Sequence, residues 1–118
     1  MKESEVLRAC EDYLQYQRNQ CKLWFTRLNS GDIFMEGRRF KGAGKGTADL
    51  MVVQSFKIPA RIETLELNVL ATNVIFIECK SSTGKQSPDQ RAFQEEVEAL
   101  GCGYFLVRDL NELEEIIY

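Results

Sequence analysis

Residues 75–90, IFIECKSSTGKQSPDQ, contain a strand-like apolar run, a glycine-containing loop and the start of a helix. Glu78 and Lys80 interrupt the apolar run two positions apart. Because side chains at i and i+2 of a strand project from the same face, the two charges should lie together, with Cys79 pointing the other way. Burying both charges is costly unless they are paired or bind a ligand. They therefore indicate either a salt bridge at the rim of a sheet or a ligand-binding site.

The helix that follows this segment begins with a recognisable cap. Ser87 is a natural N-cap, Pro88 suits the first helical position, and Gln90 completes an S-x-x-Q capping box. We expect this helix to end at Gly101 and to be followed by the apolar strand YFLVR, residues 104–108. A strand, helix, strand succession implies a right-handed crossover and at least one parallel strand pair. The expected fold class is therefore α/β.

The remaining apolar patterns predict one domain, residues 1–118, with a mixed central sheet flanked by helices. The near-continuous apolar run in TNVIFIECK predicts a central strand that is buried on both faces. Helical spacing predicts that Phe93, Val97 and Leu100 line the inner face of the capped helix. The other expected elements are a helix at 4–17, strands at 22–29 and 48–54, and a helix at 109–118.

Two segments have no clear pattern. Residues 31–46 should form a loop or an irregular hairpin, because glycines cluster toward their end. In residues 55–73, Leu65 and Leu67 alternate with polar residues as in a strand, whereas a short helix after Pro59 also fits. The structure of this second segment stays open at the level of the sequence.

The composition excludes several classes of function. Hydrophobic residues make up 44% and charged residues 28% of the 118 residues, as in an ordinary globular protein. No apolar run reaches membrane-spanning length and the first residues are too charged for a signal peptide, so we expect a cytoplasmic protein with no membrane partner. The four cysteines lack zinc-site spacing and are expected to be structural thiols. Histidine is absent, which leaves carboxylates, lysine and hard metal ions for any hydrolytic chemistry.

The charges are unevenly distributed along the chain. The net charge is −3, yet residues 94–118 hold seven acids and one base, so the rest of the chain is slightly basic. A basic loop without acids spans residues 37–48. Such a loop either holds nucleic-acid phosphates or is merely solvated. The residues expected to contact nucleic acid are Arg38, Arg39, Lys41, Lys45 and Lys85.

Asp49 lies where the basic glycine-rich loop enters a strand. An aspartate at such a position commonly caps a turn. If its strand pairs with the strand of Glu78, however, both acids would converge on one hard cation, with Lys80 beside them. Carboxylate oxygens and waters are the ligands that Mg²⁺ prefers. The sequence therefore offers a possible metal site.

Gly46-x-x-Asp49, Glu78-x-Lys80 and SPDQ together resemble the motifs of the VRR-NUC branch of the PD-(D/E)xK nuclease superfamily. The order of the expected elements is similar as well, so the resemblance covers nearly the whole chain. A single ExK is a weak signal, whereas the combined set is fairly specific. The resemblance implies a restriction-endonuclease-like core and a small stand-alone nuclease of the phage type.

The resemblance also assigns roles to individual residues. Asp49 and Glu78 resemble the family's metal-binding acids, and the backbone carbonyl of Cys79 is implied as a further ligand. Lys80 resembles the residue that orients or activates the attacking water. Gln90 matches the glutamine at the start of the family's motif helix. The implied catalytic set is therefore Asp49, Glu78, Lys80 and Gln90, with Mg²⁺ or Mn²⁺ as the cofactor.

The first helix of the family carries a glutamate near its start. Glu5 is the best match in this chain, and Glu3 is a close rival. One departure concerns the interval between Asp49 and Glu78, which is long for a small member of the family. This interval leaves the pairing of the intervening strands open.

The expected activity is hydrolysis of DNA phosphodiester bonds by a divalent-metal-dependent endonuclease. A divalent cation and Lys80 would supply the activated water and the positive charge that the reaction needs. The resemblance suggests branched substrates such as four-way junctions, and two coordinated cuts suggest a homodimer. If a phage encodes the chain, it would act in the host cytoplasm. The alternatives are a flap-cutting or restriction-like nuclease, a monomer that nicks flaps, and a non-catalytic nucleic-acid-binding module.

Overall fold

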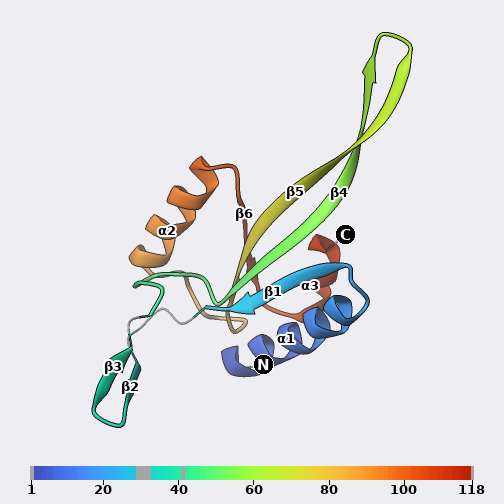
Figure 1. The fold of residues 1–118 in the computed structure, drawn as a ribbon. Helices are drawn as coiled ribbons and strands as arrows, with labels where there is room; N and C mark the ends of the chain where they lie inside the picture. The colour runs from blue at the N-terminus through green and yellow to red at the C-terminus, as the bar shows by residue number, and fades with distance from the viewer. Residues whose placement is uncertain (1, 29–32, 41, 118) are drawn as a thin grey trace.

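The computed structural model describes residues 2–28, 33–40 and 42–117. Three helices and six strands occur in these ranges, and Figure 1 shows their arrangement. In chain order they are α1 (Glu3–Asn19), β1 (Leu23–Arg27), β2 (Ile33–Met35), β3 (Arg38–Phe40), β4 (Leu50–Ile62), β5 (Leu65–Cys79), α2 (Pro88–Ala99), β6 (Gly103–Val107) and α3 (Leu110–Ile116).

The central sheet has four strands in the order β1-β4-β5-β6. β1, β4 and β5 pair antiparallel, whereas β5 and β6 pair parallel. The crossover between the two parallel strands contains α2, because a helical connection is long enough to return the chain to the same edge. The α/β class and the mixed sheet flanked by helices are therefore confirmed.

Two apolar clusters cover the two faces of the sheet. Leu50, Val52, Ile75 and Ile77 project from β4 and β5 into a cluster with buried residues of α1 and α3, and Cys79 is a buried free thiol in the same cluster. This face forms the larger part of the core.

None of the helices in the described ranges is long and apolar enough to cross a membrane.

The smaller cluster lies under α2. Val97 is buried there, and the ring of Phe93 meets that of Phe76 edge to face at 5.1 Å. Leu100 is 79% exposed, so its expected place on the inner face is wrong. The reason is that α2 ends at Ala99, and the chain turns at Leu100 before Gly101 adopts a positive φ of 89°.

Residues 55–73 form strands, and the helical alternative after Pro59 is wrong. β4 and β5 stay paired as far as Ile62 and Leu65, with a turn of two residues between them. β1 and β6 pair only with residues 50–54 and 75–79 of these strands. Residues 55–73 therefore project from the body as a two-stranded ribbon, which we call the arm (Figure 1). The arm gives the molecule an extent of 62 × 29 × 28 Å.

A second, smaller hairpin consists of β2 and β3. Glu36 and Gly37 form its turn with φ values of 52° and 72°, as a tight hairpin turn with two left-handed residues requires. The sequence predicts a loop or an irregular hairpin for residues 31–46. Residues 33–40 form this hairpin and residues 42–46 a loop, while residues 31, 32 and 41 lie outside the described residues.

Candidate active site

Three carboxylates from distant parts of the chain meet at one end of the sheet. Asp49 directly precedes Leu50, whose strand partner is Ile77, so Asp49 and Glu78 come at the same end of β4 and β5. Glu3, in the first turn of α1, joins them. One oxygen of each of these three carboxylates lies within 4.8 Å of one oxygen of the other two. This spacing allows a single cation to contact all three.

Asp49 is anchored to the motif strand by its side chain. Its Oδ2 accepts a hydrogen bond of 2.8 Å from the backbone amide of Cys79. The pairing that the long interval left open is therefore the direct antiparallel pairing of β4 with β5. Asp49 acts across strands and not only as the cap of its own turn.

Glu78 is the most deeply buried member of the cluster, with 2% of its surface exposed. Its Oε1 accepts a hydrogen bond of 2.9 Å from Nε2 of Gln90, and Nζ of Lys80 lies 3.7 Å from the same oxygen. Its other oxygen, Oε2, is buried without a hydrogen-bond partner among the described residues. A buried carboxylate oxygen in this condition is costly unless something binds to it.

The environment of Glu78 favours its protonated form. Burial, followed by the negative charge of Asp49, raises the pKa of this carboxyl from 4.5 to about 8. Lys80 opposes the shift without reversing it. Without a cation, the carboxylates of Asp49 and Glu78 have only the ammonium of Lys80 close by, so the site lacks positive charge.

Lys80 lies beside Glu78, as the i, i+2 spacing predicts. The two side chains form an ion pair, and both residues are buried. The rim salt bridge suggested by the sequence therefore exists. It leaves Oε2 of Glu78 without a partner, however, so the ion pair alone does not account for the buried charge.

Gln90 connects the capping box to the acidic cluster. Its Oε1 accepts a hydrogen bond of 2.8 Å from the amide of Ser87, and the Ser87 hydroxyl accepts one from the amide of Gln90. Its Nε2 is left free to donate to Glu78. The predicted cap is confirmed, and the same side chain reaches the cluster.

Glu5 does not reach the acidic cluster, contrary to our expectation. Its Oε2 accepts a hydrogen bond of 3.0 Å from the amide of Lys2, which stabilises the start of α1. Glu3 takes the place expected for Glu5. Residues two positions apart on a helix point in nearly opposite directions, so only one of them can face the sheet.

The glycine-rich loop packs against the start of α2. Gly46 has a φ of 83°, and a Cβ at this position would overlap the backbone carbonyl of Asp89. Lys45 pairs with the side chain of Asp89 at 3.4 Å on the surface. This close approach brings the loop that leads into Asp49 next to the helix that carries Gln90.

The other basic residues expected to contact nucleic acid lie on different elements of the chain. Arg38 on β3 and Lys85 in the loop after Lys80 are exposed. Arg39 belongs to β3, and Lys41 lies outside the described residues. The structure thus leaves Arg38, Lys45 and Lys85 available at the surface.

Arg108, which follows β6, was not recognised in the sequence. Its Nη1 donates to the backbone carbonyls of Ser81 and Gly84 at 2.5 and 2.8 Å. These bonds hold the loop that directly follows Lys80. Only its position just after an apolar strand could have suggested this role, and that is a weak signal.

Comparisons of the chain with protein-family models, with curated proteins and with solved structures gave no match. The resemblance to VRR-NUC nucleases therefore rests on the motif residues themselves, and the function has to be inferred from the chemistry of the site.

Proposed function

We propose that this chain is a divalent-metal-dependent deoxyribonuclease of the VRR-NUC kind, built on a restriction-endonuclease-like core. The observation that carries the proposal is the buried Oε2 of Glu78, which has no hydrogen-bond partner in the described part of the chain, within a cluster of three converging carboxylates. A cation at this position would supply the missing partner and offset the repulsion between Glu78 and Asp49.

The donor set fits Mg²⁺ or Mn²⁺. Glu3, Asp49 and Glu78 offer only hard oxygen ligands, and the carbonyl of Cys79 follows directly after Glu78. When bound, such an ion supplies Lewis acidity, which acidifies water and counters the charge of a phosphate. No histidine exists in the chain to favour a softer metal.

The chain's own residues have separate tasks in this proposal. The ammonium of Lys80 lies beside the cluster, where it orients the attacking water and adds positive charge next to the scissile phosphate. Gln90 donates to one oxygen of Glu78 and so holds this carboxylate in place. Asp49 is held in place by the amide of Cys79. These contacts preorganise the site before DNA arrives.

The proposed substrate is branched DNA, such as a four-way junction, in the cytoplasm of the cell or of a phage host. Arg38, Lys45 and Lys85 are exposed cations that would contact backbone phosphates, with Arg39 and Lys41 in the same basic segment. One chain holds one acidic cluster in its described residues, whereas resolving a junction takes two symmetric cuts. A homodimer supplies the second site.

Cleavage and ion binding should be measured on the same set of proteins. Wild type, Asp49→Asn, Glu78→Gln and Lys80→Met should be incubated with linear, flapped and four-way DNA, with and without Mg²⁺ or Mn²⁺. Mn²⁺ affinity should be measured by calorimetry. We expect all three variants to lose cleavage, but only the two acid variants to lose Mn²⁺ binding, because Lys80 carries no metal-ligand oxygen.

The rival functions give different results in this panel. A flap-cutting or restriction-like nuclease would prefer flapped or linear DNA over the junction. A non-catalytic binding module would bind DNA and cut nothing with either ion. Unchanged Mn²⁺ affinity in both acid variants would rule out the assigned site.

A further inference from the structure

The arm is amphipathic, and one of its faces is entirely apolar. Residues that pair directly across an antiparallel ladder share a face, and the register pairs Phe56 with Ala71 and Ile62 with Leu65. Every second residue of each strand therefore lies on one side. The face so defined, which we call the apolar face, consists of Phe56, Ile58, Ala60, Ile62, Leu65, Leu67, Val69 and Ala71.

This face lies on the same side of the two strands as the core of the body, with the polar pair Gln54 and Asn73 between them. Four core residues lie on this side of the strands, Leu50 and Val52 on β4 and Ile75 and Ile77 on β5. In the body these residues are buried under α1 and α3. Along the arm the same side of the ribbon is exposed, because the described helices end with the body (Figure 1). The outer part of the arm thus bears a core-like surface, on which Ile58, Ile62, Leu65, Leu67 and Val69 are exposed.

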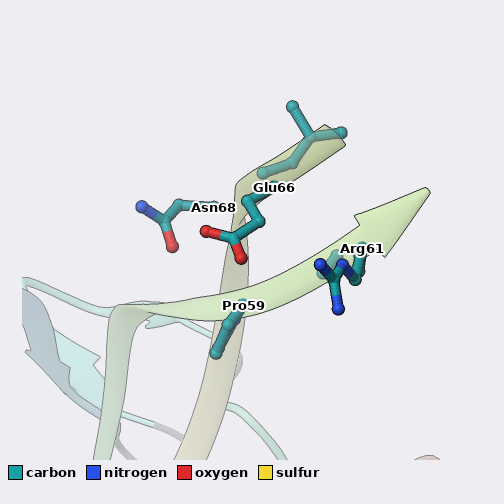
Figure 2. Close-up of a pocket in the computed structure, with 6 residues that line it drawn as sticks. Pro59, Arg61, Glu66 and Asn68 are labelled. Atoms are coloured by element: carbon teal, nitrogen blue, oxygen red, sulfur yellow. The ribbon is translucent and has the colours of Figure 1, made fainter. Parts of the chain in front are cut away.

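The opposite face of the arm is suited to water. Pro59, Arg61, Glu66 and Asn68 lie on this side, and together with Ala60 and Leu67 they line a shallow hollow of about 470 Å³ (Figure 2). The charged residues of the arm are two bases and two acids, so the arm is neutral overall. None of them lies on the apolar face.

These properties select the kind of partner. Nucleic acid would require a basic surface, which a neutral arm with an uncharged face does not offer. A membrane-binding surface would likewise need a basic polar face. The occupant must instead be an apolar surface that follows a twisted ribbon of about 27 Å, the length of eight residues per strand. The apolar face of a second copy has this length, this twist and this chemistry.

We propose that two copies of this chain associate by packing their arms against each other, apolar face to apolar face, about a two-fold axis. The two ribbons then form a small sandwich, in which each supplies the cover that the other lacks. A two-stranded ribbon alone is marginally stable in water, so this packing also stabilises the arm itself. The packing of the two arms is inferred from the structure alone. The proposed function enters only as the use of the dimer, which would join two cleavage sites.

The test compares two exposed leucines that occupy opposite faces of the arm. Leu65 and Leu70 both belong to β5 and are 59% and 67% exposed, but Leu65 lies on the apolar face and Leu70 on the opposite one. Sedimentation equilibrium at micromolar concentration should give wild type a mass twice the 13.6 kDa of one chain. Leu65→Lys should raise the dimer dissociation constant roughly 100-fold or more, because each copy would bury an unpaired ammonium. Leu70→Lys should stay dimeric.

A second variant keeps the test decisive if Leu65→Lys folds poorly. Replacing residues 57–70 by Asn-Gly leaves a short hairpin closed at Phe56 and Ala71 and should yield a folded monomer by circular dichroism. A monomeric wild type, a dimeric short-arm variant, or equal dissociation by Leu65→Lys and Leu70→Lys would overturn the proposal. Glu78→Gln should remain dimeric even if no DNA is cut, so failure of the nuclease and failure of the dimer are distinguishable.

Discussion

Gln90 joins a helix cap to the acidic cluster through the two ends of one amide group. Its Nε2 donates to Oε1 of Glu78 at 2.9 Å, and its Oε1 accepts from the amide of Ser87 at 2.8 Å. The backbone bond that orients the amide oxygen thereby orients the amide nitrogen as well. The start of α2 and the motif strand are thus held in one hydrogen-bonded unit.

Gln90→Glu should separate the two roles of this side chain. A glutamate can still accept from the amide of Ser87, so the capping box should be kept and its contribution to stability should change by no more than about 1 kcal/mol. It cannot donate to Glu78, and it places a further carboxylate there, so we expect cleavage with Mn²⁺ to fall at least about 10-fold. Gln94→Glu, on the same helix but bonded to Gln86, is the matched control and should cut normally. Wild-type rates in Gln90→Glu would leave only the capping role.

Glu3 and Glu5 provide a paired test of the metal site. Glu3→Gln should lower the affinity for Mn²⁺ by about 10-fold, because one of three converging carboxylates is removed. Glu5→Gln should bind Mn²⁺ like wild type and lose at most about 1 kcal/mol of stability, because its side chain serves the helix start. Calorimetric titration checks both. The reverse ranking would return the role of ligand to Glu5.

The raised pKa of Glu78 predicts how stability depends on pH when no ion is present. The carboxyl has a pKa of about 8 in the folded chain and about 4.5 unfolded, so between these values the folded state holds the extra proton. The stability that this proton contributes is fully present below the pKa of the unfolded chain, about 4.5. It is lost as pH rises through the pKa of the folded chain, about 8. In chelator, the free energy of unfolding should therefore fall by several kcal/mol from pH 4.5 to 8, at about 1.4 kcal/mol per pKa unit.

The control for this pH dependence is Glu78→Gln, which removes the titrating group and should flatten the curve over the same window. Urea unfolding at several pH values measures the slope for both proteins. Adding Mn²⁺ to wild type at high pH should restore stability, because the ion favours the ionised carboxylate. A wild-type curve as flat as that of the variant would contradict the assigned pKa.

Alanine substitutions at Gly46 and Gly101 should separate the cost of backbone strain from the cost of a steric clash. Both have a positive φ, but only at Gly46 would an added Cβ overlap the backbone of Asp89, whereas nothing lies within 4 Å at Gly101. Gly101→Ala should cost about 1 kcal/mol of stability. Gly46→Ala should cost roughly 3 kcal/mol or more, because the loop and the start of α2 must move apart. Urea unfolding measures both, and equal losses would show that the clash is relieved elsewhere.

Local chemistry made some parts of this structure predictable. The cap at Ser87 involves residues within one helical turn, and the shared face of Glu78 and Lys80 follows from the two-residue period of a strand. Such features depend on nearest neighbours in the chain, so their residue types and spacing suffice to identify them. The alternation of Leu65 and Leu67 fits a strand, but the sequence left a helix after Pro59 open, and the structure decided for the strand.

Long-range packing decided the remainder. Whether Glu3 or Glu5 faces the cluster depends on how α1 is rotated against the sheet, and the sequence spacing of the two glutamates cannot specify that rotation. The projection of the arm depends on β1 and β6, which are each five residues long and leave the outer halves of β4 and β5 without neighbours. The sequence by itself determined the alternation at Leu65 and Leu67, which a strand would place on one apolar side. Only the tertiary structure decided that this side is exposed, because burial depends on which other elements are long enough to cover it.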